Sequence, residues 1–173
     1  MANSTWSGPV RSENGFQDIT KNTTTGAITT NFTLGNSGLL ATPVALTDAN
    51  TTLSATVHGG RTLVIPNLAS EKTFTLPSPS AGLYFKFVYG GAANDAQNSV
   101  IDTGSDTNFF IGGLVHLDIG DDNANVYSNG SSNSKVTLGQ QGAMEINILA
   151  KDSVNWYIWG YICSSAAPSF ADQ

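Results

Sequence analysis

Apolar and polar residues alternate with a period of two through much of this 173-residue chain. Successive side chains of a β-strand point to opposite faces, so this period predicts strands that are buried on one side. In one such stretch Phe85 and Phe87 share one face, and Tyr84 and Lys86 share the other. The alternating stretches are 28–34, 52–57, 72–76, 83–89, 144–149 and 154–162. Helical periodicity is almost absent, so we expect these stretches to pair into sheets.

Turn-forming residues separate the alternating stretches at short intervals. Segments rich in Gly, Pro, Asn and Asp lie at 58–60, 76–82, 89–95, 120–125 and 128–134. Many short strands joined by such turns are typical of a sandwich or barrel. We therefore predict an all-β fold, an antiparallel β-sandwich of jelly-roll type.

The stretch 154–162 is apolar or aromatic on both faces. Tyr157, Trp159 and Tyr161 alternate with Trp156 and Ile158. A strand with two apolar faces is either central in a sheet and covered, or covered by a neighbouring subunit. Both possibilities remain open at this point.

The N-terminal residues follow no regular period, because their apolar residues are spaced unevenly among Gly, Pro and Asn. We interpret residues 1–26 as an extended arm that becomes ordered on a partner. The β-sandwich domain is then expected over 27–165, with a short C-terminal tail over 166–173.

Charge and composition restrict the class of partner. The net charge is −6 and only 12% of the residues are charged, which argues against a protein that binds nucleic acid through its phosphates. No apolar run approaches the roughly 18 residues of a membrane span, and no apolar leader follows Met1. The single cysteine, Cys163, favours assembly in a reducing cytosol. We expect a soluble protein without a membrane partner.

The sequence Asp102-Thr103-Gly104-Ser105 is literally the aspartic-protease signature. That chemistry requires two such carboxylates that share a proton, and one copy per chain would demand a homodimer. The simpler interpretation is a turn at the end of a strand, in which Asp102 caps the turn and Gly104 takes a positive φ.

Other polar clusters give weaker signals for chemistry. The loop 118–125 offers carboxylate and amide oxygens that suit Ca²⁺, but it lacks the Gly and Glu positions of an EF-hand. His58, His116 and Cys163 show no metal-ligand spacing and no Cys–His arrangement. We therefore expect no enzyme activity, no cofactor and no metal site, and a bound ion in this loop stays an alternative.

A set of aromatic residues is a candidate for binding sugar rings by stacking. The alternative is that these residues pack in the core or in a subunit interface. The residues are Tyr84, Tyr89, Tyr157, Trp159 and Tyr161.

Several longer stretches together resemble the β-rich capsid decoration, or cement, proteins of marine tailed bacteriophages, including cyanophages. They are "TFTLPSPSAGLYFKFVYGG", "VIDTGSDTNFFIGGLVHLD" and "SKVTLGQQGAMEINILAKDSVNWYIWGYI". The opening "STWSGPVRSENGF" is similar to the N-terminal segment of the same group. The resemblance covers most of the chain but little of 36–66.

The resemblance implies a virion protein that binds the exterior of an assembled icosahedral capsid, as a homotrimer whose arms clamp neighbouring coat subunits. The expected partner is the major capsid (coat) protein. The expected contacts to it are Trp6, Val10 and Phe16 as apolar anchors, Pro9 as a rigid extended point and Arg11 as an ion-pairing group. The alternatives are a trimeric fibre or receptor-binding module, and a glycan-binding module.

Overall fold

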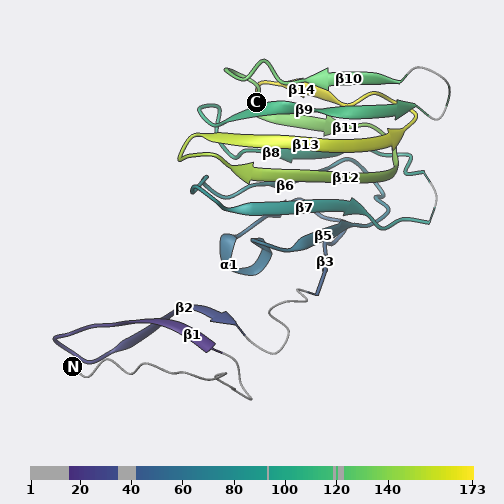
Figure 1. Ribbon diagram of the computed structural model, residues 1–173. Coiled ribbons are helices and arrows are strands. Elements are labelled where there is room, and N and C mark those ends of the chain that lie inside the picture. The colour runs from purple at the N-terminus through teal and green to yellow at the C-terminus, as the bar shows by residue number, and fades with distance from the viewer. Residues whose placement is uncertain (1–15, 35–41, 93, 119, 121–122) are drawn as a thin grey trace, which may run out of the picture. The chain divides into compact units, whose positions relative to one another are not determined.

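The computed structural model describes residues 16–34, 42–92, 94–118, 120 and 123–173, and the chain divides into two compact units, Met1–Thr42 and Pro43–Gln173. In the first unit, strands β1 (Phe16–Lys21) and β2 (Ile28–Leu34) form an antiparallel two-stranded sheet (Figure 1). The turn between them is closed by Asn22, whose Oδ1 accepts hydrogen bonds from the backbone N–H groups of Thr24 and Thr25. The strand expected over 28–34 is thus confirmed, and it pairs with a strand inside the segment interpreted as an arm.

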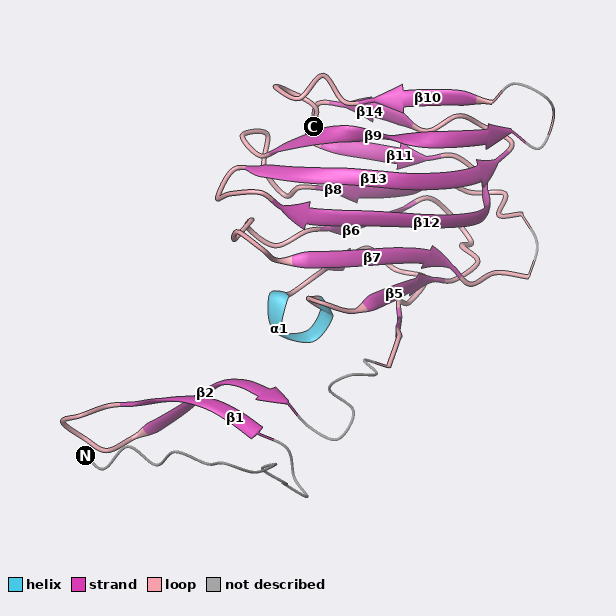
Figure 2. Cartoon of the chain, in the orientation of Figure 1, coloured by secondary structure: helices cyan, strands magenta, loops and turns pink. Residues whose placement is uncertain are grey.

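The second unit consists of a seven-stranded and a five-stranded sheet that face each other (Figures 1 and 2). The larger sheet has the order β10-β9-β13-β12-β7-β5-β3 and the smaller has the order β14-β11-β8-β6-β4. The larger sheet contains β3 (Val44–Ala45), β5 (Thr62–Ile65), β7 (Tyr84–Tyr89), β9 (Phe109–Asp118), β10 (Ala124–Tyr127), β12 (Gln141–Ala150) and β13 (Asn155–Ser164). The smaller contains β4 (Thr51–Thr52), β6 (Lys72–Thr75), β8 (Ser99–Asp102), β11 (Lys135–Leu138) and β14 (Ser169–Ala171). The predicted all-β sandwich is confirmed.

The sheets are mixed rather than purely antiparallel as expected. From β3 to β9 the chain crosses from one sheet to the other at every step. Each return to a sheet therefore runs in the same direction as the previous visit, which makes β3, β5 and β7 parallel, and likewise β4, β6 and β8. The remaining pairs of β7, β12, β13, β9 and β10 are antiparallel except for β13 with β9.

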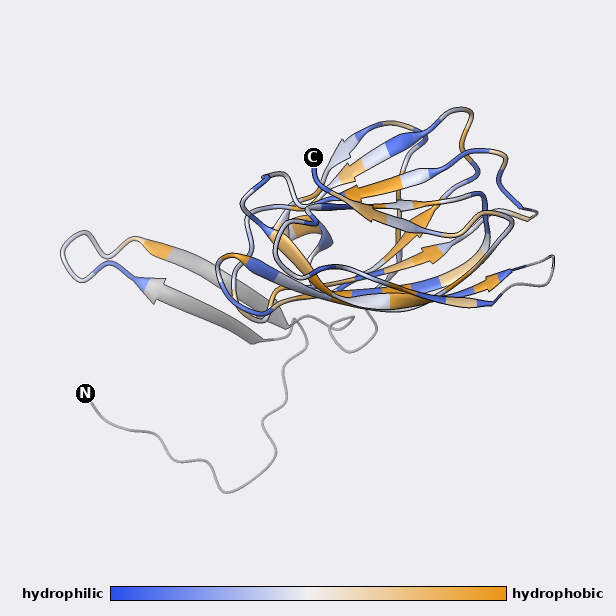
Figure 3. Cartoon of the chain, turned by 90° about the horizontal axis from the view of Figure 1, so that it is seen from above, coloured by the Kyte–Doolittle hydropathy of each residue, from blue (hydrophilic) through white to orange (hydrophobic). Residues whose placement is uncertain are grey.

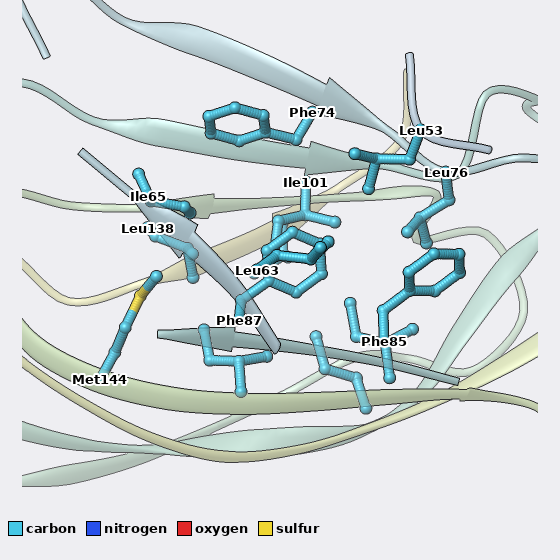
Figure 4. Close-up of a cluster of buried hydrophobic side chains, with 14 of the residues drawn as sticks. Leu53, Leu63, Ile65, Phe74, Leu76, Phe85, Phe87, Ile101, Leu138 and Met144 are labelled. Carbon is cyan, nitrogen blue, oxygen red and sulfur yellow. The ribbon is translucent and has the colours of Figure 1, made fainter. Parts of the chain in front are cut away.

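One continuous hydrophobic core fills the space between the two sheets. The predicted alternation is visible in the burial of β7, where Phe85 and Phe87 are buried, and of β12, where every second residue from Met144 to Ala150 is buried. Apolar residues recur along the strands of both sheets (Figure 3), and side chains such as Phe74, Phe85 and Phe87 meet between them (Figure 4). The core is apolar because each sheet turns one face of its pleat inward.

The strand expected over 52–57 is wrong. The chain instead forms a single helical turn, α1 (Ala55–His58), after the short strand β4. The hydroxyl of Ser54 accepts a hydrogen bond from the backbone N–H of Val57, and His58 Nδ1 accepts one from the backbone N–H of Ser54. This local capping competes with strand pairing, so Val57 is exposed while Leu53 remains in the core.

Residues of the predicted C-terminal tail pack onto the sandwich. Strand β14 pairs antiparallel with β11. The ring of Phe170 lies 6.2 Å from that of Phe110 in an edge-on arrangement. The smaller sheet therefore ends in a strand from the C-terminus.

Candidate functional site

The residues predicted to contact a coat protein belong to the first unit. Trp6, Pro9, Val10 and Arg11 lie outside the described residues, so their roles stay predictions. Phe16 is the first residue of β1.

The site that the described residues do form is the outward face of the seven-stranded sheet. Strand β13 lies between β9 and β12, which confirms that it is central in its sheet. Its inward side chains Trp156 and Ile158 are buried, whereas Trp159 is 45% exposed. Six large apolar side chains are exposed on this face, and we call them the outer aromatic face: Val115, Leu117, Tyr127, Tyr157, Trp159 and Tyr161.

The strand register explains how these side chains come together. Tyr161 is paired with Val115 across the parallel β13–β9 ladder, and Trp159 is paired with Gly113. Gly113 is in turn paired with Tyr127 of β10, and a Cβ atom at Gly113 would lie 2.9 Å from Cδ1 of Tyr127. The Tyr127 ring therefore lies over Gly113, which is itself paired with Trp159 on its other side.

Polar side chains flank the aromatic rings on β7 and β12. Lys86 Nζ lies 3.1 Å from Glu145 Oε1, and the Tyr84 hydroxyl donates a hydrogen bond to Asn147 Oδ1. The Tyr84 ring also lies 6.5 Å from that of Trp159, tilted by 34°. These groups are thus engaged with one another within the chain.

The surroundings of Glu145 and Tyr84 shift the pKa values of these two groups. The hydrogen bond from Lys86, supported by one from Asn147, lowers the pKa of Glu145 below its usual value. Burial raises the pKa of Tyr84, an effect that Lys86 opposes. Both shifts favour the forms that these groups already hold near neutral pH, the Glu145 carboxylate and the neutral Tyr84 phenol.

Four of the five aromatic residues predicted to stack on sugars gather on or beside this face. Tyr89 does not, because its ring packs against the core and its hydroxyl donates to Asn67 Oδ1 at 3.1 Å. Tyr127, 69% exposed, belongs to the face but was not predicted. It stands alone in a polar segment, and only the pairing of β10 with β9 reveals its position.

The Asp-Thr-Gly-Ser sequence forms the turn that its alternative interpretation describes. Asp102 Oδ1 accepts a hydrogen bond from the backbone N–H of Gly104, which adopts φ +78°. The side chain of Gln173 also donates to this carboxylate. The hydroxyl of Thr103 donates to the carbonyl oxygens of Ser105 and Asn108, which closes the following loop.

The residues weighed as metal ligands are separated in the structure. Within the described ranges, no three His, Cys, Asp or Glu residues lie close enough to hold a metal ion. His58 Nδ1 accepts a hydrogen bond from the backbone N–H of Ser54, and His116 is buried with Nε2 3.2 Å from the carbonyl oxygen of Ser164. Of the loop 118–125, Asp121 and Asp122 lie outside the described residues, so the ion-binding alternative there stays untested.

None of the helices in the described part of the chain has the length and apolar character to cross a membrane. The chain matches no protein-family model and no curated protein sequence.

Proposed function

We propose that this protein is a structural, non-enzymatic component of a phage virion that decorates and stabilises the outer surface of an icosahedral capsid. The observation that supports this most directly is the division of the chain. The chain divides into a small N-terminal unit that contains a β-hairpin and a larger unit that forms the sandwich. That organisation suits a protein that is held by one unit and presents the other.

In this proposal the N-terminal unit runs across neighbouring coat subunits. Trp6, Val10 and Phe16 fill apolar pockets on the coat, and Arg11 pairs with a coat carboxylate. Burial of a large apolar side chain stabilises a contact by roughly 1.5–3 kcal/mol at about 25 cal/mol/Å². A seam between coat subunits gains this contribution once for every copy bound.

The test is deletion of residues 2–17, followed by addition of the purified protein to capsids that lack it. We expect the truncated protein to keep its thermal unfolding midpoint, because the sandwich is a separate unit, and to lose binding and capsid hardening. Trp6→Ala should weaken binding in the same assay, with Thr5→Ala as the matched control. A truncated protein that still decorates and hardens capsids would contradict the clamp.

A second candidate is a trimeric fibre or a glycan-binding module. The exposed aromatic side chains of β13 and β10 favour it, because sugar rings stack on such side chains. Copy number separates the two functions, since decoration predicts hundreds of copies per particle and a fibre predicts far fewer. Binding to a glycan array that is lost in Trp159→Ala would support the second candidate.

A further inference from the structure

We propose that the outward face of the seven-stranded sheet carries a self-modification site, at which Lys86 forms an isopeptide bond with the side chain of Asn147. This bond joins strand β7 covalently to strand β12, and the chain is its own substrate. The inference goes beyond capsid decoration and does not rest on it. It is carried by the contacts of four neighbouring side chains, which are Tyr84, Lys86, Glu145 and Asn147.

The two reacting side chains are opposite each other in the β7–β12 ladder. Lys86 and Asn147 are directly paired in this antiparallel ladder, so their side chains leave the sheet on the same face with Cβ atoms about 4.5–5.5 Å apart. Phe85 and Phe87, on either side of Lys86, are buried, so Lys86 points away from the core. Its flexible four-carbon stem can therefore bring Nζ to Cγ of Asn147, the carbon of the carboxamide.

The carboxylate of Glu145 contacts both reacting side chains. Its Oε1 lies 3.1 Å from Nζ of Lys86, and it also accepts a hydrogen bond from the side chain of Asn147. The only donor of an asparagine side chain is its Nδ2 amide group, so Glu145 contacts both the nitrogen that attacks and the nitrogen that leaves. A carboxylate within hydrogen-bond reach of both nitrogens can move protons between them.

The carbonyl oxygen of Asn147 has a hydrogen-bond donor of its own. The Tyr84 hydroxyl donates to Asn147 Oδ1 in a partly buried position, with the ring of Tyr84 6.5 Å from that of Trp159. A donor at this oxygen stabilises the negative charge that develops there when an amine adds to Cγ. Burial raises the pKa of Tyr84, so the hydroxyl keeps the proton that it donates.

The reaction exchanges one amide for another and involves no change of oxidation state. Glu145 takes a proton from the Lys86 ammonium group, and the freed amine adds through Nζ to Cγ of Asn147. Glu145 passes that proton to Nδ2 and then accepts a second proton from Nζ. The Cγ–Nδ2 bond breaks, and ammonia leaves and takes up the second proton. The products are a secondary amide and an ammonium ion, so the chain loses one positive charge.

The test is a time course of intact mass on the purified full-length protein in mildly alkaline buffer, because only the uncharged amine is a nucleophile. We expect the mass to fall from that of the sequence by one ammonia molecule. Digestion should then yield a branched peptide that joins the segments containing Lys86 and Asn147. Lys86→Arg keeps the positive charge beside Glu145 and should keep the mass of its sequence. The matched control is Lys72→Arg, at another lysine paired with a carboxylate, which should lose ammonia as the unmodified chain does.

Two further variants test the assigned roles. Glu145→Gln keeps both reacting side chains and should slow the loss of ammonia by roughly a hundredfold or more, because it removes the group that carries the protons. Tyr84→Phe should slow it by about a hundredfold, because it removes the donor at Oδ1. Circular dichroism identifies any variant that fails to fold. Unchanged rates in the folded Glu145→Gln variant would contradict the proposed reaction.

The inference is overturned if the unmodified chain keeps the mass of its sequence, or if folded Lys86→Arg loses ammonia as fast as the unmodified chain. Loss of ammonia without the branched peptide would also overturn it, and would indicate a cyclic imide formed by attack of a backbone nitrogen on an asparagine side chain. Because no capsid takes part, failure here leaves capsid decoration standing, and failure of capsid binding leaves the cross-link standing.

Discussion

Strand β13 carries two tryptophans three residues apart, in opposite environments. Trp156 points into the core, is fully buried and lies 6.0 Å from the ring of Phe85. Trp159 points outward and is nearly half exposed beside Tyr84. The inner side of the sheet is closed by the chain's own second sheet, whereas the described residues leave the outer side uncovered. The contrast separates a side chain that fills the core from one that the core does not need.

The largest effect is expected at the inner tryptophan. Trp156→Ala should lower the free energy of unfolding by about 3–5 kcal/mol, because it leaves a large cavity between the sheets. Trp156→Phe should cost much less, since Trp156 Nε1 has no hydrogen-bond partner among the described residues and the replacement removes this N–H group. Chemical denaturation monitored by circular dichroism measures both. Equal losses for the two variants would show that ring volume does not determine the stability of the core.

The second largest loss of stability is expected at Gly160, which follows Trp159 in β13. Gly160 has φ +144°, and a Cβ atom there would lie 2.0 Å from the carbonyl oxygen of Glu145. Gly160→Ala should therefore cost about 2–3 kcal/mol of unfolding free energy. The control is Gly130→Ala, where φ is +74° and a Cβ atom meets nothing within 4 Å, at about 1 kcal/mol. The reverse order of the two losses would be inconsistent with this close approach of strands.

The outer tryptophan should tolerate substitution better than the inner one. Trp159→Ala should lower the unfolding free energy by about 1 kcal/mol, because nearly half of its surface is already exposed and no cavity forms between the sheets. The same chemical denaturation measures this loss. A loss as large as that of Trp156→Ala would contradict the contrast between the two positions.

The smallest effect concerns the ion pair on the outer face. The pKa of Glu145 is lowered in the folded chain, so its contribution to stability is present above its unfolded pKa and is lost as the pH falls through its folded pKa. The pair is partly exposed and screened by solvent, so the contribution is slight. Glu145→Gln should flatten the acidic end of a stability–pH curve slightly, with Glu71→Gln as control. A stronger acid dependence in Glu145→Gln than in the unmodified chain would contradict the sign.

The period-two pattern predicted the strands that bury one face in the core. In β7, β12 and β13 the residues expected to share one face include Phe87, Ile146 and Trp156, which are buried, whereas Tyr89 at the end of β7 is only partly buried. The pattern could not predict which strands pair, because alternation specifies a face and not a neighbour. The parallel pairing of β3, β5 and β7, and of β4, β6 and β8, could therefore be seen only in the structure.

The errors have local physical causes. The pattern around Ser54 suggested a strand, but the Ser54 side chain caps a helical turn instead. The position of Tyr127 on the outer face depends on the β10–β9 register, to which a single tyrosine in a polar segment gives no clue. The turn at Asp102 was predictable, because Asp and Gly at this spacing serve the same local geometry in many proteins.

The alternation of the chain between the two sheets has a consequence for the order of folding. From β3 to β9 no strand pairs with the strand next to it in sequence, so none of these ladders can start as a hairpin. The pair β12–β13, joined by a short turn in which Asp152 accepts hydrogen bonds from Val154 and Asn155, can start locally. Strand pairs that are far apart in sequence form slowly, because the loop between them must close first. We therefore expect β12 and β13 to nucleate the sandwich and the parallel strands β3 to β8 to pair afterwards. Pulsed hydrogen exchange during refolding should protect β12 and β13 before β5 and β6.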